Sequence, residues 1–232
     1  MPNKRKRARP DDYFKDWKQR EALAEGMIPL VGQLSREKNV RCYIYGKPLV
    51  NRSVFEIMKD HRYVRQVEGN ELSEKETYPI FSRLNQLDLG PAHIDVGRLA
   101  VGYSDQGIAQ GLNLEQYIDR ELGPLIGSKG KPLEKPQDVV LYGFGRIGRL
   151  MARILIDKTG GGDCLRLRAI VVRKGKAAND LEKRASLLRR DSVHGAFEGT
   201  IRMDEERQSF VANGNEIKVI YADAPDTIDY TQ

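Results

Sequence analysis

Residues 139–150 read Val-Val-Leu-Tyr-Gly-Phe-Gly-Arg-Ile-Gly-Arg-Leu, and this stretch decides the fold class that we predict. Its apolar beginning stops at a glycine, which is typical of a buried strand in a parallel sheet. From Ile147 onward, apolar residues recur at three- and four-residue steps, the spacing of one helix face. Residues 165–172 are again apolar and partly alternating, so a second strand is expected. These segments predict one βαβ unit with a right-handed crossover.

The turn between the first strand and the helix has the pattern G-x-G-x-x-G. Gly143 permits the tight turn, Gly145 lets the backbone approach a pyrophosphate, and Gly148 lets the helix pack on the strand. The free N–H groups of the first helical turn then face the phosphates, aided by the helix dipole. The pattern occurs by chance, but here it stands between a strand and a helix, as the motif requires. The candidate cofactor-binding residues of this turn are Gly143, Phe144, Gly145, Arg146, Ile147 and Gly148.

The end of the second strand bears on which dinucleotide is bound. An NAD-specific unit places an acid there for the ribose 2′-hydroxyl. Here Arg173 and Lys174 follow the strand, then Lys176, and no acid occurs before Asp180. Because arginine pairs with a 2′-phosphate that a carboxylate would repel, we expect NADP to be accepted or even preferred to NAD. The alternative is that Arg173 is a solvated strand end and that later residues set the cofactor.

Further elements complete an α/β unit. Leu181, Ala185 and Leu188 predict a short helix, and residues 200–203 and 208–212 predict paired strands. Asn213-Gly214 then predicts a two-residue hairpin turn. The predicted fold class is α/β, with a partial Rossmann-type NAD(P)-binding domain over residues 138–232 behind a mainly α-helical extension. The sheet should be incomplete and should leave an exposed edge.

Residues 11–122 are expected to be helical. One amphipathic stripe is formed by Phe14, Trp17, Ala24, Ile28, Val31 and Leu34, and Pro29 should kink or break that helix. Capping-box spacing occurs at Ser53 with Glu56, at Ser73 with Glu76, and at Asn113 with Gln116 ahead of Tyr117, Ile118 and Leu122. His61 and His93 stand alone and are interpreted as packing or surface residues. This region is interpreted as an interaction or assembly element.

Two segments flank the helical region. Residues 123–137 concentrate glycine and proline, which indicates a linker and a domain boundary near residue 137. Residues 1–10 form a basic tail that contains Lys4, Arg5, Lys6, Arg7 and Arg9 and no acid. This tail and residues 138–191, with 13 basic and 6 acidic residues, carry the excess positive charge, and the rest of the chain is net acidic, which leaves the net charge at +6. The tail could bind nucleic acid or serve in localisation, but a disordered solubilising end is favoured, so a nucleic-acid partner is not expected.

The remaining composition limits the classes of protein. The two cysteines, Cys42 and Cys164, are far apart and have neither zinc nor redox-motif spacing, so a reducing compartment and incidental thiols are expected. No apolar run approaches the roughly 18 residues that would span a bilayer. The basic start is not followed by an apolar segment, so it is not a secretory signal. A cytoplasmic protein without membrane or metal sites is expected.

Three segments in order resemble glyceraldehyde-3-phosphate dehydrogenases. Residues 139–150 are similar to the opening strand, turn and helix of that family. Residues 187–195, Leu-Leu-Arg-Arg-Asp-Ser-Val-His-Gly, resemble its second conserved segment, and residues 212–214 with 217–219 resemble the hairpin that follows. The helical leader more loosely resembles the extension of a longer bacterial form. Two departures are Tyr142, where the family commonly has asparagine, and Val172-Arg173, where it usually has Asn-Asp.

The resemblance implies a tetrameric enzyme that oxidises glyceraldehyde 3-phosphate to 1,3-bisphosphoglycerate with NAD(P)⁺ and phosphate. In the family a thiolate attacks the aldehyde, hydride passes to nicotinamide, and phosphate releases the thioester. The nucleophile lies in a Ser-Cys-Thr-Thr-Asn-Cys segment that these 232 residues lack. His194 does not match the family's catalytic histidine. No catalytic residue is therefore assigned, and the chain is expected to be an inactive amino-terminal fragment.

Two other interpretations remain open. The chain could be a binding module that senses NAD(P)H or docks a partner without catalysis. It could also bind nucleic acid through residues 1–9 and the basic residues of 138–191, although those residues belong to elements whose cations can simply be solvated.

Overall fold

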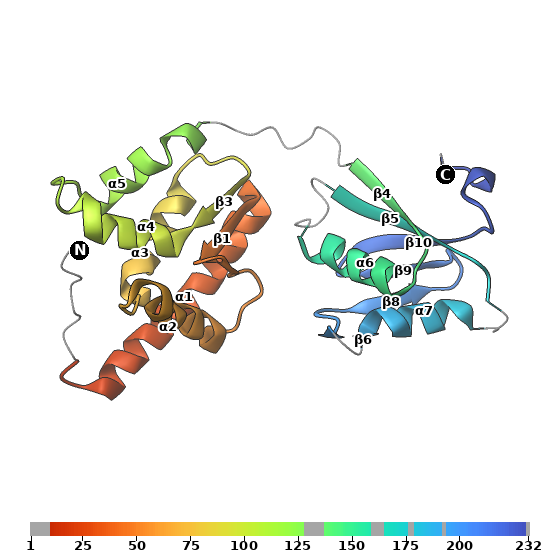
Figure 1. Ribbon diagram of the computed structural model, residues 1–232, viewed down its shortest axis with the longest axis horizontal. Helices are drawn as coiled ribbons and strands as arrows, with labels where there is room; N and C mark the ends of the chain where they lie inside the picture. The colour runs from red at the N-terminus through yellow and green to blue at the C-terminus, as the bar shows by residue number, and fades with distance from the viewer. Residues whose placement is uncertain (1–9, 128–136, 159–164, 176–178, 192–193, 231–232) are drawn as a thin grey trace. The chain divides into compact units, whose positions relative to one another are not determined.

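The computed structural model describes residues 10–127, 137–158, 165–175, 179–191 and 194–230 (Figure 1). These residues form two compact units, one reaching residue 127 and the other starting at residue 137. The predictions for residues 1–9 of the basic tail, for residues 128–136 of the linker, for Cys164 and for Lys176 lie outside the described residues.

The first unit is mainly helical with a small sheet. Its helices are α1 (Tyr13–Lys38), α2 (Val54–Glu68), α3 (Glu74–Gln86), α4 (Val96–Gly102), the π-helical turn η1 (Tyr103–Gly107), α5 (Leu114–Glu121) and the 3₁₀ turn η2 (Gly123–Leu125). Its strands are β1 (Val40–Ile44), β2 (Lys47–Pro48) and β3 (Ala92–Asp95). They form a sheet in the order β2-β1-β3, with β1 antiparallel to β2 and parallel to β3.

Helix α1 differs from the prediction in two ways. The helix is not broken at Pro29, although a proline removes one backbone hydrogen bond. The buried residues of its inner face hold the surrounding turns against the core. The predicted apolar stripe is buried only in part, since Phe14, Trp17 and Ile28 are exposed. The start of α1 therefore extends beyond the core of the unit.

The predicted helix starts are confirmed. Ser53, Ser73 and Asn113 each cap a helix in a complete capping box with the residue three positions later. Each box satisfies backbone N–H groups that the first helical turn leaves free. Tyr117, Ile118 and Leu122 of α5 and of its end are buried, as predicted.

The sequence did not predict the strands of the first unit. β1 alternates between buried and partly buried residues, and its parallel partner β3 lies about fifty residues later in the chain, with Val40 paired to Ala92. Such a long-range pairing leaves no mark in a local pattern, because each strand contains only a few residues.

A buried polar group joins α2 to α3. His61 is fully buried, with its Nδ1 2.8 Å from the carbonyl oxygen of Ile57 and its Nε2 2.7 Å from Oγ1 of Thr77. Because a carbonyl only accepts, Nδ1 carries the proton and Nε2 accepts from the hydroxyl. Burial lowers the pKa of His61. Glu74, also fully buried, is held by Nε of Arg20 at 2.5 Å. The packing role expected for His61 is therefore confirmed.

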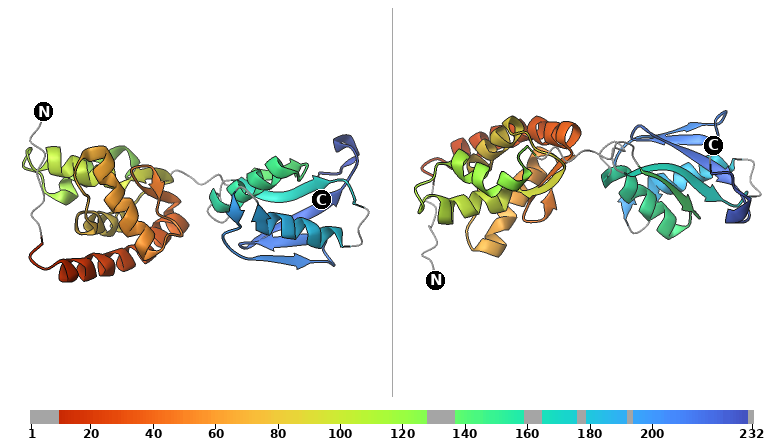
Figure 2. Two further views of the ribbon diagram at one scale, coloured as in Figure 1. Left: turned by 60° about the horizontal axis from the view of Figure 1, so that its bottom comes forward. Right: turned by 90° about the horizontal axis from the view of Figure 1, so that it is seen from above.

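The second unit is an α/β sandwich of one sheet and two helices. It contains β4 (Gln137–Tyr142), α6 (Arg146–Lys158), β5 (Leu165–Val172), α7 (Asp180–Arg189), β6 (Arg190–Asp191), β7 (Gly195–Ala196), β8 (Ile201–Asp204), β9 (Ser209–Ala212), β10 (Asn215–Tyr221) and the 3₁₀ turn η3 (Pro225–Thr227). The two helices lie side by side (Figure 2), where Arg153 of α6 donates to the carbonyl oxygen of Leu188 in α7 at 2.6 and 3.0 Å.

The sheet has the order β4-β5-β10-β9-β8. β4, β5 and β10 are parallel, and β9 and β8 add to them in antiparallel pairs. The hairpin turn predicted at Asn213-Gly214 is confirmed, with φ values of 46° and 82° that suit a two-residue turn. β4 stands at the edge and pairs only with β5 among the described residues. Mixed α/β architecture with a parallel Rossmann-type sheet behind a helical unit matches the predicted fold class.

Candidate functional site at the β4–α6 turn

The glycine-rich turn lies at the carboxyl end of β4. The backbone N–H of Gly143 donates to the carbonyl oxygen of Val171 in β5 at 2.8 Å, which fixes the turn to the neighbouring strand. The first hydrogen bond of α6 runs from the N–H of Arg149 to the carbonyl oxygen of Gly145 at 3.0 Å. The N–H groups of the first turn precede that bond and have no helical acceptor. Their partial positive charge makes this helix end suited to an anion.

The three glycines of the motif have three different surroundings. Gly143 has a φ of +96°, a conformation that L side chains rarely adopt. A Cβ at Gly148 would overlap the carbonyl oxygen of Gly143, so the helix can approach the turn only with glycine there. A Cβ at Gly145 would meet no atom within 4 Å, so the backbone there borders open space. This arrangement matches the three roles that the sequence analysis gave them.

The side chains of the motif point in different directions. Phe144 is buried, with its ring centroid 6.1 Å from that of Phe210, so it anchors the turn to the sheet. Ile147 is 78% exposed, and Arg146 is exposed without a side-chain hydrogen bond or ion pair to any described residue. The backbone of Phe144 and the side chain of Arg146 therefore remain available to a ligand.

Arg149 lies behind the turn and was not singled out by the sequence analysis. Its Nη1 donates to the carbonyl oxygen of Phe144 at 3.3 Å, and its Nε is buried without a hydrogen-bond partner among the described residues. This partly buried guanidinium adds positive charge beside the helix end. The second arginine of the motif, Gly-Arg-Ile-Gly-Arg, is the signal that could have identified it.

The end of β5 comes close to the turn. β4 and β5 run parallel with Tyr142 paired to Val171, so their carboxyl ends meet at one edge of the sheet. Arg173 and Lys174, exposed, directly follow the last residue of β5. The Nζ of Lys174 lies 6.0 Å from the centroid of the Tyr221 ring. The structure thus brings the two predicted groups of cofactor residues to the same end of the parallel strands.

The nearest acid after β5 is occupied by other groups. Asp180 is buried, and its Oδ2 accepts from Nε of Arg184 at 2.7 Å. The pKa of Tyr221 is raised by burial and then by its hydrogen bond to Asp180. Arg184 also donates to the carbonyl oxygen of Arg173 at 2.8 Å, which braces the strand end. The charge of Asp180 is therefore neutralised, whereas the Arg173 side chain has no ion-pair partner among the described residues.

Other candidate residues do not form a catalytic group. Cys42 is buried in the first unit, and burial raises the pKa of its thiol to about 12, so it is no nucleophile near neutral pH. His194 pairs with Asp191, with its Nδ1 3.0 Å from Oδ1. Within the described part of the chain, no three histidine, cysteine or acidic side chains gather as metal ligands. Nor does any helix there have the length and apolar character to cross a membrane.

Comparison with known proteins decides the family of the second unit. Residues 137–232 match the family model described as glyceraldehyde 3-phosphate dehydrogenase, NAD binding domain. These residues belong to the glyceraldehyde-3-phosphate dehydrogenase family. The second unit accordingly matches the NAD-binding, Rossmann-type domain of that family, as the resemblance implied.

Relatives of known name extend this result. The chain is 55% identical over 208 residues to a glyceraldehyde-3-phosphate dehydrogenase-like protein of Pseudomonas aeruginosa (strain UCBPP-PA14). The aligned region covers 89% of this chain and 44% of the relative. That match reaches well into the first unit. The chain is 35% identical over 90 residues to glyceraldehyde-3-phosphate dehydrogenase 1 of Giardia intestinalis, and this match covers 39% of the chain and 24% of the relative. The chain is also 37% identical over 84 residues to the glyceraldehyde-3-phosphate dehydrogenase of Zymomonas mobilis, and this match covers 35% of the chain and 21% of the relative. The chain thus spans less than half the length of these relatives.

Proposed function

We propose that the second unit binds NAD or NADP at the β4–α6 turn, with the pyrophosphate over the first turn of α6. The observation that carries this proposal is the open space at Gly145 beside the free N–H groups of Arg146 and Ile147. The bound nicotinamide would accept a hydride, while the chain's own residues hold the cofactor. The residues proposed to hold it are Gly143, Phe144, Gly145, Arg146, Ile147, Gly148, Arg173 and Lys174.

The proposed activity is that of a phosphorylating glyceraldehyde-3-phosphate dehydrogenase, to which this chain contributes the cofactor domain. The family of residues 137–232 supports this proposal. The whole protein would act as a cytoplasmic tetramer in glycolysis or gluconeogenesis, with its nucleophilic cysteine outside these 232 residues. Residues 1–10 would form a basic tail, 11–122 a helical extension, 123–137 a linker and 138–232 an incomplete cofactor domain.

The 232-residue polypeptide is expected to bind the dinucleotide without turning over glyceraldehyde 3-phosphate, because neither Cys42 nor Cys164 matches the family's nucleophile. An assay with glyceraldehyde 3-phosphate, phosphate and NAD⁺ or NADP⁺ tests this, because reduction of the nicotinamide can be monitored by its absorbance. Turnover by this polypeptide would contradict the assignment. Sequencing the gene beyond codon 232 separates the enzyme from a non-catalytic cofactor-binding module. A downstream Ser-Cys-Thr-Thr-Asn-Cys segment supports the enzyme, and its absence supports the module.

We further propose that Arg173 allows NADP to bind by pairing with its 2′-phosphate. Its guanidinium is exposed and unpaired among the described residues, and the nearest acid, Asp180, is neutralised by Arg184. A charge-assisted pair of this kind stabilises a complex by about 1.5–3 kcal/mol.

The substitution Arg173→Asp should weaken NADP⁺ binding by roughly 10- to 100-fold, since about 1.4 kcal/mol is a factor of ten. NAD⁺ binding should weaken little or improve, because a carboxylate can accept from the 2′-hydroxyl. Calorimetric titration of both cofactors measures this, and Arg202→Asp in β8, which makes the same charge change on an edge strand, is the matched control. Wild-type protein that binds NAD⁺ far more tightly than NADP⁺ would refute the proposed role of Arg173.

A further inference from the structure

A large groove lies on the first unit, away from its core. It has a volume of about 1240 Å³, and it is bordered by the start of α1, by α2, by the α2–α3 connection and by the first turn of α3. This volume exceeds the range of about 300–1,000 Å³ typical of small-molecule pockets. The groove is therefore larger than a typical small-molecule pocket.

Exposed aromatic rings border this groove. Trp17 is 45% exposed and Phe55 is 56% exposed, and their rings stack with centroids 6.4 Å apart at 28°. Tyr13 is exposed beside them, and the buried side chain of Met58 also lines the groove. Trp17 belongs to the apolar stripe that the sequence predicts for this helix. Aromatic side chains left on a surface are typical of the anchoring residues of protein interfaces.

Three of the four carboxylates that line the groove, all but the exposed Asp11, are occupied within the unit. Asp16 accepts from Nζ of Lys75 at 2.7 Å, and Glu71 lies 3.2 Å from Nη1 of Arg20. Glu76 caps α3 by accepting from the backbone N–H of Ser73 at 2.8 Å. These acids are thus offset by a neighbouring cation or by a helix start.

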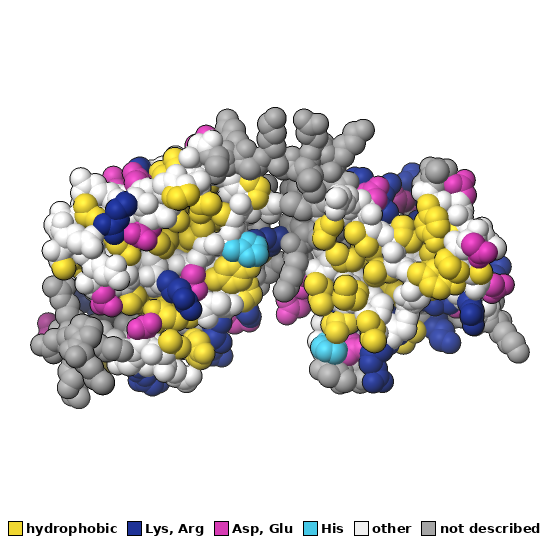
Figure 3. Space-filling model, turned by 45° about the horizontal axis from the view of Figure 1, so that its top comes forward, with side chains coloured by type: hydrophobic (Ala, Val, Ile, Leu, Met, Phe, Trp, Pro, Cys, Tyr) yellow, Lys and Arg dark blue, Asp and Glu magenta, His cyan; other side chains and the backbone are white. Residues whose placement is uncertain are grey.

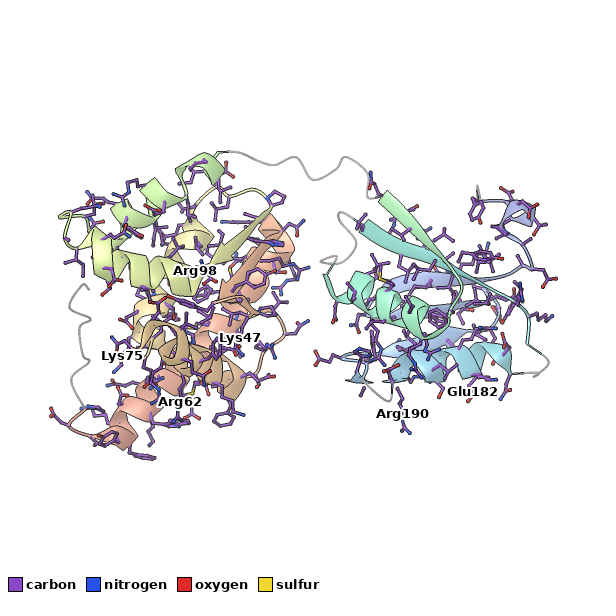
Figure 4. The ribbon with its side chains drawn as sticks, in the orientation of Figure 1. Lys47, Arg62, Lys75, Arg98, Glu182 and Arg190 are labelled. Carbon is purple, nitrogen blue, oxygen red and sulfur yellow. The ribbon has the colours of Figure 1, made fainter. Side chains whose placement is uncertain are left out.

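Three cations on α2 are not offset in this way. Lys59, Arg62 and Arg65 line the groove at three-residue steps and are exposed, and none of their side chains bonds to another described residue. Figure 4 shows Arg62 and Lys75 near α1 and α2. Unpaired positive charge therefore stands next to the aromatic rings.

We propose that this groove binds an acidic, amphipathic α-helix of a partner protein. The apolar side of the helix would pack on Trp17, Phe55 and Met58, as helices do in hydrophobic grooves. Its carboxylates would face Lys59, Arg62 and Arg65, so that the charges of the two partners are complementary. A nucleic acid fits less well, because single-stranded nucleic acids bind on aromatic rings that stack with successive bases, whereas Trp17 and Phe55 stack on each other.

Selection from a display library of random peptides of about 16 residues, roughly 24 Å long as a helix, tests the proposal on the full chain. Enriched sequences should place aromatic or aliphatic residues at helical three- and four-residue steps, with Asp and Glu between them. Enrichment of basic peptides, of peptides without this pattern, or of none would overturn the proposal.

Variants then locate the binding site of the best enriched peptide. Arg62→Glu with Arg65→Glu, and separately Trp17→Ala with Phe55→Ala, should each weaken its binding by about tenfold or more by fluorescence anisotropy. Arg36→Glu is the matched control, since residue 36 is exposed on the same helix about 28 Å along its axis from Trp17. All these side chains are exposed, and circular dichroism checks that each variant is folded.

Two outcomes at this stage contradict the proposal. Binding that the groove variants leave unchanged would place the peptide elsewhere. Binding of an oligodeoxythymidine of about 16 nucleotides more tightly than the peptide, with loss in the same variants, would make the groove a nucleic-acid surface instead.

Discussion

The substitution Gly148→Ala should destabilise the second unit by about 2–3 kcal/mol, and Gly148→Val should leave it largely unfolded. The added Cβ would overlap the carbonyl oxygen of Gly143, which is backbone and cannot rotate away. Gly143 is itself fixed by its hydrogen bond to Val171 and by its φ of +96°. The clash can be relieved only by moving α6 off the strand. A loss of this size is a large fraction of the ~5–15 kcal/mol that stabilises a typical domain.

Urea unfolding followed by circular dichroism measures this loss, and the first unit provides an internal reference because its core is separate. Gly145→Ala is the matched control, since a Cβ at that position meets no atom within 4 Å. A Gly148→Ala protein that unfolds at the same urea concentration as the wild type would show that the helix does not pack on the turn as described.

At Gly145 the expected effect is the reverse: Gly145→Asp should keep the fold and lose the cofactor. The side chain would extend into the open space beside the start of α6, where the pyrophosphate is proposed to lie. Its negative charge would also oppose the phosphates at the helix end. We expect the dissociation constant for NAD⁺ to rise by about 100-fold or more, which corresponds to about 2.7 kcal/mol.

Gly123→Asp in the first unit makes the same change at another glycine with open space around it, and should leave binding unchanged. Calorimetric titration of both variants with NAD⁺ gives the comparison. If Gly145→Asp bound NAD⁺ as the wild type does, the nucleotide would not lie over the β4–α6 turn.

The sequence predicted the second unit closely because its signals are local. The turn at Gly143–Gly148 lies between a strand and a helix in the structure, as its pattern required, and Asn213-Gly214 forms the hairpin. The capping boxes at Ser53, Ser73 and Asn113 succeeded for the same reason, since each involves residues three positions apart.

Features set by tertiary packing were not predictable. The helix pattern around Trp17 shows an apolar stripe but does not show that α1 extends past the core and leaves Trp17 exposed. The pairing of β1 with β3 joins residues about fifty positions apart. The neutralisation of Asp180 by Arg184 became visible only in the structure, where Arg184 of α7 reaches both Asp180 and the carbonyl oxygen of Arg173. This contact leaves the cations Arg173 and Lys174 at the strand end without a free acid from Asp180.

The second unit exposes hydrophobic side chains on the edge strand β4 and on the helix α6 that follows it. Figure 3 shows hydrophobic side chains gathered on one face of that unit. Exposed apolar residues of β4 and α6 are Val140, Tyr142, Ile147, Met151 and Ile154. β4 has a partner strand on only one side among the described residues, so its outer edge has the form that favours association. The exposed edge expected from the sequence is thus observed.

The central claim is that the β4–α6 turn of this chain holds a dinucleotide. Calorimetric titration of the wild-type 232-residue polypeptide with NAD⁺ and with NADP⁺ tests it most directly. The structure predicts saturable binding of one nucleotide per chain that Gly145→Asp abolishes and Gly123→Asp preserves. Failure of both cofactors to bind a polypeptide that circular dichroism shows to be folded would contradict the claim.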